Sequence, residues 1–388
     1  MLNKILRIYS YITAILFFIF IFGLFAADLS ETCENQKGKD IGIKAIVSDM
    51  ESVDSVIYPF ININGAFQNI MKRDYIYDAK PSNAIIKKKS GYIVSTDEKY
   101  DRKDIEKCVA DLQKKQERLA CYGIPLVYIQ APGKMSGSPE RSMPGLHNYT
   151  YDKYADFKEE AEDASFDYVD TKAWMSKDWD KNFYVTDHHW KTEVCLDAAY
   201  RFCSYLSDEY GISVDTDALR EENFRNNTLK QMFLGAEGRR TGIWYAGLDD
   251  FTVITPKYET NFDVWISDKE KKHHKRKGSF EEAVMDTTKD LSKYSFEKSA
   301  YYAYWGGDYG RVHVVNNNVR GKGKVMVIKD SYGIPVTAFM SCALSEMDIL
   351  DYRYYKEDKS IWEIIEEERP DAVLYIYGTG YLTYPSMF

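Results

Sequence analysis

Two short stretches of the chain hold residue types that a nucleophile and a proton-accepting base could use. The stretch FYVTDHHWKTEV, residues 183–194, contains Asp187, His188, His189 and Trp190. The stretch VMVIKDSYGIP, residues 325–335, places Ser331 directly after an apolar run. A serine is a poor nucleophile unless an imidazole takes its proton and a third group orients that imidazole. An aspartate, a histidine and a serine brought together by the fold could form such a set.

Ser331 lies at a predicted strand-to-helix turn. The run 325–331 is typical of a strand, Gly333 permits a tight backbone path, and Pro335 suits the first turn of a helix. Such a turn exposes the serine Oγ at the carboxyl end of a sheet, where open α/β folds place their sites. The helix that follows offers unpaired N–H groups and its positive dipole end to an oxyanion. A serine that only caps the next helix shows the same pattern, so the position alone does not establish a nucleophile.

We assign His189 as the base and Asp187 as its orienting group. The two residues are two apart, so on a tightly turned segment the carboxylate can reach the imidazole Nδ1–H. His188 is the alternative base, but its direct adjacency leaves the carboxylate less freedom to turn onto the ring. A zinc site of these three residues with His313 is a rival, disfavoured because adjacent histidines point apart and no His-x-His or His-x-x-x-His spacing occurs. We therefore predict no metal and no cofactor, and expect Trp190 either in the core or stacked on a sugar.

The N-terminus predicts export. Lys4 and Arg7 precede an uncharged run at 8–27 that is long enough to cross a bilayer, and acidic residues follow it. The positive-inside rule then keeps the N-terminus in the cytoplasm and places the rest outside. A cleaved signal peptide is the rival interpretation, but Leu24 and Phe25 fit badly at the −3 position of a cleavage site. We predict a single-pass protein of the cell membrane, with an anchor at 1–27.

Composition excludes several classes of protein. The chain has 388 residues, 45% of them hydrophobic, which is ample for one large core or two ordinary ones. The net charge of −9 argues against nucleic-acid binding, which normally needs a broad basic surface. The six cysteines include no Cys-x-x-Cys pair, which argues against a zinc ribbon. Their spacing does not indicate a dense disulfide framework either.

Strand and helix patterns alternate beyond a polar stalk at 28–55. The predicted elements are a strand at 91–95, a helix at 103–121, a buried strand at 124–132, a helix around 195–206, a strand at 251–256, a solvated basic loop at 269–277, a strand at 325–331, a helix at 334–344, mostly strand at 347–355, a helix at 361–368 and a strand at 371–377. This order favours one α/β domain at 56–388 with right-handed crossovers and a large insertion around 210–300.

The pair of stretches resembles a known family. TDHHWKTE followed far downstream by IKDSYG resembles the DHHW proteins, relatives of the bacterial alginate O-acetylation proteins that carry an SGNH-hydrolase-like domain. The resemblance runs from about residue 55 to the C-terminus. Further stretches that carry it are NINGAFQNIM at 62–71, IPLVYIQAPGK at 124–134, YYAYWGGDYG at 301–310, DILDYRYY at 348–355 and DAVLYIYGTGYL at 371–382.

The resemblance implies a fold and a site. The fold would be a circularly permuted, flavodoxin-like SGNH domain of three layers with a mainly parallel sheet. The triad would be Asp187, His189 and Ser331, in agreement with the assignment from spacing. Relatives often carry an asparagine near the end of the last strand, where this chain has Gly378. We expect backbone N–H groups near Ser331 and Tyr332 to replace it as oxyanion donors. Tyr332, Gly333, Arg353 and Trp190 are the candidates for binding the oxyanion or substrate. The alternative for Arg353 is a plain surface residue or an ion-paired one.

The resemblance also implies an activity. The family usually moves acetyl groups onto hydroxyls of an exported polysaccharide, and a membrane-bound O-acyltransferase typically supplies them. We therefore expect an extracytoplasmic O-acetyltransferase that forms an acetyl-serine. A carbohydrate acetylesterase with the same triad and a non-catalytic polysaccharide-binding or assembly protein are the alternatives.

Overall fold

The computed structural model describes residues 54–77, 84–139, 147–164, 166–268, 272–286 and 299–387, with single residues at 15, 23, 291, 294 and 296. The predicted anchor at 1–27 and nearly all of the predicted stalk at 28–55 lie outside these residues. Among the residues that the structure describes, no helix is both long and apolar enough to cross a membrane. The anchor and its orientation therefore stay predictions.

A mixed sheet of eight strands forms the centre of the fold. Its order is β5-β4-β13-β11-β12-β10-β8-β9. The parallel strands are β4 (Leu126–Gln130), β5 (Asp167–Asp170), β11 (Lys324–Lys329), β12 (Glu346–Leu350) and β13 (Ala372–Tyr377). The antiparallel strands are β8 (Phe262–Ser267), β9 (His273–Gly278) and β10 (Arg311–Asn316). The mainly parallel sheet that the sequence predicts is thus confirmed for five strands, with an antiparallel edge added to it.

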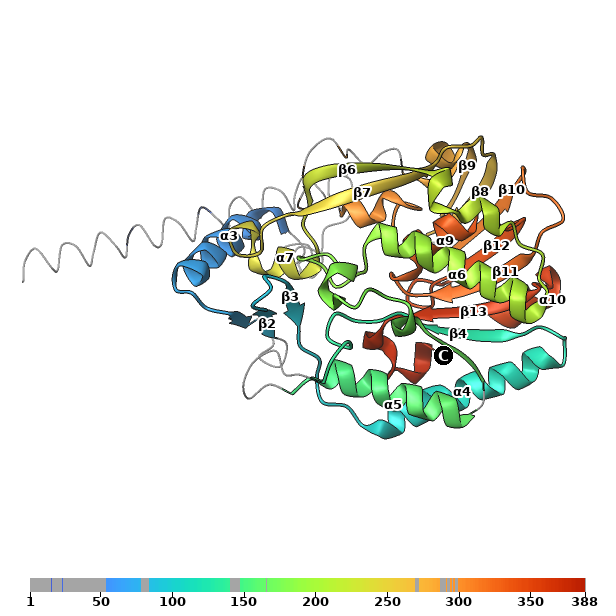
Figure 1. The fold of residues 1–388 in the computed structure, drawn as a ribbon, viewed down its shortest axis with the longest axis horizontal. Coiled ribbons are helices and arrows are strands. Elements are labelled where there is room, and N and C mark those ends of the chain that lie inside the picture. The colour runs from blue at the N-terminus through green and yellow to red at the C-terminus, as the bar shows by residue number, and fades with distance from the viewer. Residues whose placement is uncertain are drawn as a thin grey trace, which may run out of the picture.

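Helices cover both faces of the sheet (Figure 1). On one face lie α4 (Arg102–Ala120), α5 (Tyr149–Ala164) and α10 (Ile361–Glu368), and on the other α6 (Thr192–Tyr210) and α9 (Gly333–Met340). Strand β4 shows why two layers are needed: Val127 and Ile129 enter one apolar cluster, while Leu126 and Tyr128 enter the other. A strand with apolar residues on both sides must be covered on both sides. The predicted three-layer α/β arrangement is confirmed.

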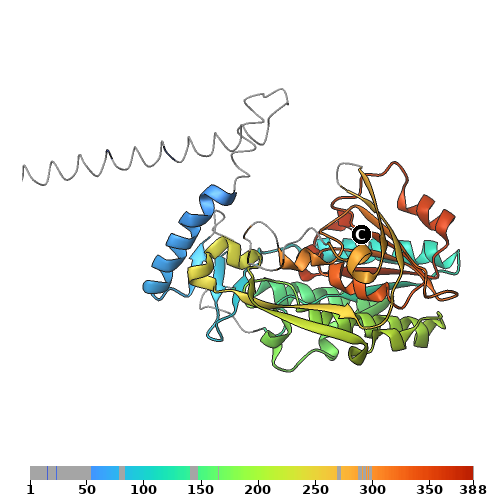
Figure 2. The same ribbon diagram turned by 90° about the horizontal axis from the view of Figure 1, so that it is seen from above.

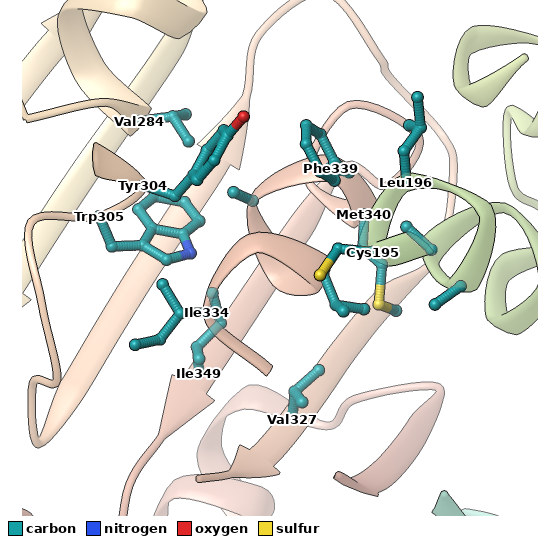
Figure 3. Packing of buried hydrophobic residues seen from close by; sticks show 14 of the residues in the cluster. Cys195, Leu196, Val284, Tyr304, Trp305, Val327, Ile334, Phe339, Met340 and Ile349 are labelled. Atoms are coloured by element: carbon teal, nitrogen blue, oxygen red, sulfur yellow. The ribbon is translucent and has the colours of Figure 1, made fainter. Parts of the chain in front are cut away.

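Helix α9 is buried along its whole length. Figure 3 shows Ile334 and Phe339 of this helix packed among Val327 of β11, Cys195 of α6 and Trp305. Its sequence is apolar on every face because neighbouring elements contact every face. Close packing on all sides leaves the first turn of α9, which follows Ser331, little freedom to move.

The segment 210–300, predicted as an insertion, contributes to two sheets. β6 (Phe224–Phe233) and β7 (Asp249–Pro256) form a separate antiparallel pair, while β8 and β9 extend the main sheet. The short helices α7 (Ala236–Thr241) and α8 (Ile243–Ala246) connect β6 to β7.

The prediction of a solvated basic loop at 269–277 was wrong for residues 273–277, which belong to β9. Their main chain pairs with β8 at every position. The charged composition suits an edge strand, because charged side chains at a sheet edge oppose pairing with another chain. Residues 269–271 lie outside the described part of the chain.

The predicted strand at 347–355 was too long, since β12 ends at Leu350. The Asp351 carboxylate accepts a hydrogen bond from the Arg353 N–H at 3.1 Å, which turns the chain away from the sheet.

A smaller unit lies at one end of the molecule. Its three strands β1 (Tyr75–Tyr77), β2 (Ala84–Lys87) and β3 (Ile93–Ser95) form an antiparallel sheet. Helix α3 (Asp54–Ile70) lies against α7 and α8, and Figure 2 shows it at the end of the molecule. The Asn62 side chain accepts a hydrogen bond from the Ile243 N–H at 2.8 Å, which ties α3 to the segment between β6 and β7.

Candidate active site

The structure brings together the three side chains that the sequence predicts as a triad. His189 Nδ1 lies 2.5 Å from Asp187 Oδ1, and His189 Nε2 lies 2.8 Å from Ser331 Oγ. All three side chains are buried or nearly so, and all line one cleft of about 540 Å³. The arrangement has the order and distances that serine activation by an imidazole requires.

A tight turn before α6 positions the aspartate and the histidine. Residues 183 and 190 pair across it, and the Tyr184 N–H donates to the His189 carbonyl at 3.3 Å. Within the turn, Asp187 Oδ1 also accepts the His189 N–H at 2.9 Å. This local bond turns the carboxylate toward the ring, which is the geometry that a separation of two residues permits.

Two residues at the start of α7, Gly235 and Ala236, hold the other side of Asp187. The Ala236 N–H donates to Asp187 Oδ2 at 2.7 Å. Gly235 packs so closely that a Cβ there would lie 2.1 Å from Asp187 Cβ. Sequence analysis missed both residues, because nothing in a Gly-Ala pair some fifty positions away indicates that it contacts the triad.

Burial and neighbouring charge set the protonation states of the pair. Burial opposes ionisation of Asp187, but His189, His188 and hydrogen bonds hold its pKa well below the usual range. Burial, and then the neighbouring His188, lowers the pKa of His189 to about 4, although Asp187 acts in the opposite direction. At neutral pH the carboxylate is therefore ionised and the imidazole neutral. A neutral His189 can accept a proton from the Ser331 hydroxyl.

The alternative base, His188, makes no hydrogen bond to Ser331 among the described residues, whereas His189 does. Its Nδ1 lies 3.8 Å from Asp187 Oδ1, and its ring is tilted by 35° against that of His189, with 3.9 Å between ring centroids. His313 lies on β10 beside Asp348, so the four-residue zinc set is not assembled. Asp187, His188 and His189 do place one ligand atom each within 4.8 Å of one another. However, both Asp187 oxygens and both His189 nitrogens already have hydrogen-bond partners.

Asp330 organises the turn that carries the serine. Its Oδ1 accepts the Tyr332 N–H at 2.9 Å, and its Oδ2 accepts the Gly378 N–H at 2.7 Å. Burial raises the pKa of Asp330 to about 6. The carboxyl ends of β11 and β13 are thereby joined beside Ser331.

This arrangement corrects two of the predicted oxyanion candidates, the N–H groups of Tyr332 and Gly333. The Tyr332 N–H is used by the Asp330 side chain, and the Gly333 N–H donates to the Asp330 carbonyl at 3.1 Å. The Ser331 N–H makes no hydrogen bond within the described residues, so it is the main-chain donor that remains available at this turn. An amide already bound to a protein acceptor cannot also serve an oxyanion without losing that bond.

Glycine at 378, in place of the expected asparagine, has a steric cause. A Cβ at this position would lie 2.5 Å from the Tyr332 ring. The ring occupies the space that a side chain would need, and the Tyr332 hydroxyl donates to the His188 carbonyl at 2.9 Å. Tyr332 therefore contributes to the site through its side chain rather than through its N–H.

Of two other predicted site residues, Arg353 lines the cleft and Trp190 is buried in the core. The Arg353 guanidinium donates to Asp351 Oδ2 at 2.6 Å and to Asp308 Oδ1 at 2.9 Å, so Arg353 is ion-paired. Trp190 is 0% exposed, which excludes stacking on a sugar. Its Nε1–H donates to the Tyr332 carbonyl at 3.1 Å, so it supports the turn at the serine from within the core.

Comparison with known proteins agrees with this fold. Residues 92–236 match the family described as SGNH hydrolase-like domain, acetyltransferase AlgX. Bacillus cereus PatB1 is similar, with a TM-score of 0.65 and 16% identity over 79% of this chain and 99% of that chain. PatB1 with a sulfonyl adduct has a TM-score of 0.64 and 15% identity over 81% of this chain and 98% of that chain. No curated protein sequence matches the chain.

A DHHW family protein from Eubacterium siraeum is also similar, with a TM-score of 0.58 and 18% identity over 80% of this chain and 94% of that chain. The chain thus has the SGNH-hydrolase-like α/β fold. Its resemblance to the DHHW proteins and to the alginate acetylation proteins, first seen in the two sequence stretches, is confirmed.

Proposed function

We propose that the protein is an extracytoplasmic O-acetyltransferase that acetylates hydroxyls of a cell-surface or exported polysaccharide. The observation that carries the proposal is the chain of hydrogen bonds from Asp187 through His189 to Ser331. The family matched by residues 92–236 is described as an acetyltransferase, which supports transfer of an acetyl group.

In the first half-reaction, His189 Nε2 takes the proton of Ser331 while Oγ attacks the acetyl carbonyl carbon. The free Ser331 N–H stabilises the oxyanion. The intermediate collapses, the bond to the donor's leaving group breaks, and that group takes the proton from His189. The product is acetyl-Ser331.

In the second half-reaction, a sugar hydroxyl attacks the acetyl carbon and His189 takes its proton. The Ser331 Oγ then leaves and recovers that proton from His189. Transfer prevails over hydrolysis when the sugar is held near the ester, since proximity can raise its effective concentration far above that of a free solute. A cleft of about 540 Å³ offers room for a sugar unit beside the ester.

The donor and the location belong to the same proposal. A membrane-bound O-acyltransferase would supply acetyl groups, and the uncharged run at 8–27 would hold this chain in the cell membrane beside it. Both follow from the family resemblance and from the sequence.

A carbohydrate acetylesterase is the second candidate. The observation in its favour is that the His188 side chain, which lines the cleft beside the base, is 41% exposed, so water has access to this part of the cleft. A non-catalytic binding or assembly protein is the third, favoured by the engagement of the Tyr332 and Gly333 amides, which leaves few free oxyanion donors.

The test uses the full-length protein in detergent micelles. Treatment with 4-nitrophenyl acetate should add one acetyl group that maps to Ser331, and a sulfonyl fluoride should modify the same residue. Ser331→Ala should abolish both adducts, whereas Ser204→Ala, on α6 and outside the cleft, should keep them. If wild-type protein forms neither adduct, Ser331 is not an activated nucleophile and the proposal is wrong. In cells, Ser331→Ala should abolish acetylation of the surface polysaccharide.

A further inference from the structure

Beside the triad lies a carboxylate with one oxygen that has no partner. Glu237, in the first turn of α7, is 3% exposed and lines the same cleft. Its Oε1 accepts a hydrogen bond from the Ser95 hydroxyl at 3.1 Å, but its Oε2 has no hydrogen-bond partner within the described residues. Buried carboxylate oxygens are almost always hydrogen-bonded, so this atom calls for an explanation. The mechanism above does not use it.

His188 is the exposed side chain next to this carboxylate. Its Nδ1 lies 3.8 Å from Glu237 Oε1, and its side chain is 41% exposed. Its main chain is held, because its carbonyl accepts the Tyr332 hydroxyl at 2.9 Å. The ring is therefore the part that can turn, and its centroid lies 3.9 Å from that of the His189 ring. A group bound between His188 and Glu237 would lie next to the base.

The chemistry of the two substrates decides which one these side chains would bind. An acetyl group offers a methyl and a carbonyl oxygen, neither of which can donate a proton to a carboxylate. A sugar offers several hydroxyls, each of which can donate to Glu237 Oε2 or bond an imidazole nitrogen. A carboxylate and an imidazole side by side match two neighbouring hydroxyls of one ring.

Resting on the proposed function, we propose that Glu237 and His188 form the acceptor subsite, which holds the hydroxyls adjacent to the one that is acetylated. An acceptor hydroxyl reaches Oε2 as the His188 ring turns aside. The subsite orients the acceptor rather than taking part in proton transfer.

Charge in the cleft indicates the class of acceptor. Its acidic lining residues are Asp97, Asp187, Glu237, Asp308 and Asp330. Its basic lining residues are Lys134, Arg239 and Arg353, and Arg353 is already ion-paired with Asp308 and Asp351. An anionic sugar bound at this subsite would place its charge next to the Glu237 carboxylate, and the two charges would repel each other. The subsite therefore favours a neutral or amino sugar over a uronic acid.

The test separates transfer from hydrolysis. Full-length protein in detergent is first acetylated on Ser331 with 4-nitrophenyl acetate, then chased with cello-oligosaccharide, chito-oligosaccharide or mannuronate oligosaccharide. Mass spectrometry measures acetylated sugar against released acetate. Glu237→Gln keeps the shape of the side chain but replaces an acceptor oxygen with a donor. We expect it to lower the ratio of transfer to hydrolysis by roughly 10- to 100-fold, the range for one hydrogen bond to a charged group.

Matched variants test whether a change in the ratio of transfer to hydrolysis comes from lost binding of the sugar. Glu222→Gln, exposed and outside the cleft, should leave the ratio unchanged. His188→Gln should lower it, and the double variant with Glu237→Gln should lose less than the two single losses multiplied, because neighbouring groups that bind one ligand are coupled. A purely structural Glu237 would instead lower transfer and hydrolysis together and leave the ratio unchanged.

The outcomes are distinct. An unchanged ratio in Glu237→Gln overturns the acceptor subsite while leaving the proposed function intact. Preferred transfer to the mannuronate oligosaccharide overturns the assignment of a neutral or amino sugar. Absence of acetyl-Ser331 in the wild-type protein refutes the proposed function itself.

Discussion

Replacing Gly235 by alanine should displace Asp187 and slow acetylation of Ser331. The new Cβ would lie 2.1 Å from Asp187 Cβ and 2.5 Å from its Cα, whereas ordinary van der Waals contact begins at 3.4 Å. These neighbours are not the far end of a flexible side chain, so they cannot simply rotate away. One of the two segments must therefore move by roughly 1 Å or more.

The displacement should affect both stability and rate. Overpacking of a tight contact costs about 1–3 kcal/mol in the free energy of unfolding. The same movement weakens the 2.7 Å bond from the Ala236 N–H to Asp187 and turns the carboxylate away from His189. Because a misplacement of about 1 Å at a reacting group can cost about 100-fold in rate, we expect a loss of that order.

The assay is the rate of acetyl-Ser331 formation from 4-nitrophenyl acetate, followed by release of nitrophenol, with urea unfolding in parallel. Gly123→Ala is the control, because Gly123 has a φ of +71° and nothing within 4 Å of a new Cβ. It should cost about 1–2 kcal/mol in backbone strain without changing the rate. If Gly235→Ala forms the adduct within about twofold of the wild-type rate, contact with Gly235 does not position the triad.

Three further outcomes are expected. The rate of acetyl-Ser331 formation should stay constant from neutral pH down to about 5 and fall to half near pH 4, because protonated His189 cannot accept a proton. A half-maximal rate near pH 6.5, the ordinary pKa of histidine, would contradict the effect of burial on the pKa of His189. Gly378→Asn should lower the urea midpoint and slow the adduct, because the new side chain meets Tyr332; faster adduct formation would mean that an oxyanion donor had been restored. Trp190→Phe should lower the free energy of unfolding by about 1–3 kcal/mol, because the Tyr332 carbonyl loses its indole donor. The Michaelis constant for the sugar, measured from the rate of acetyl transfer, should stay the same.

The order of elements was predictable because it depends on local periodicity. Ile105, Val109 and Leu112 recur at helical spacing, and all three are buried in the face of α4 that covers the sheet. The apolar runs at 124–132 and 371–377 became the buried central strands β4 and β13. Such patterns report burial within one element, and neighbours in sequence suffice to produce them.

Edges and ends were less predictable. The basic run at 273–277 contains none of the apolar alternation that indicates a strand, and its pairing with β8 comes from the main chain. Likewise Trp190 looks the same in sequence whether it faces a cleft or the core, and only its neighbours decide that it is buried.

The sequence by itself determined the α/β order of elements, the residues Asp187, His189 and Ser331, and the family that they resemble. Few kinds of site need these residue types at this spacing, and the contact between Asp187 and His189 forms within one turn of the chain. Tertiary structure alone decided which groups surround them. Four features of the site depend on contacts that the fold makes. They are the packing of Gly235 and Ala236 against Asp187, the Tyr332 ring beside Gly378, the Tyr332 N–H bonded to Asp330, and the Glu237 oxygen without a partner. Such contacts follow from how packed layers meet, and no pattern of neighbouring residues encodes them.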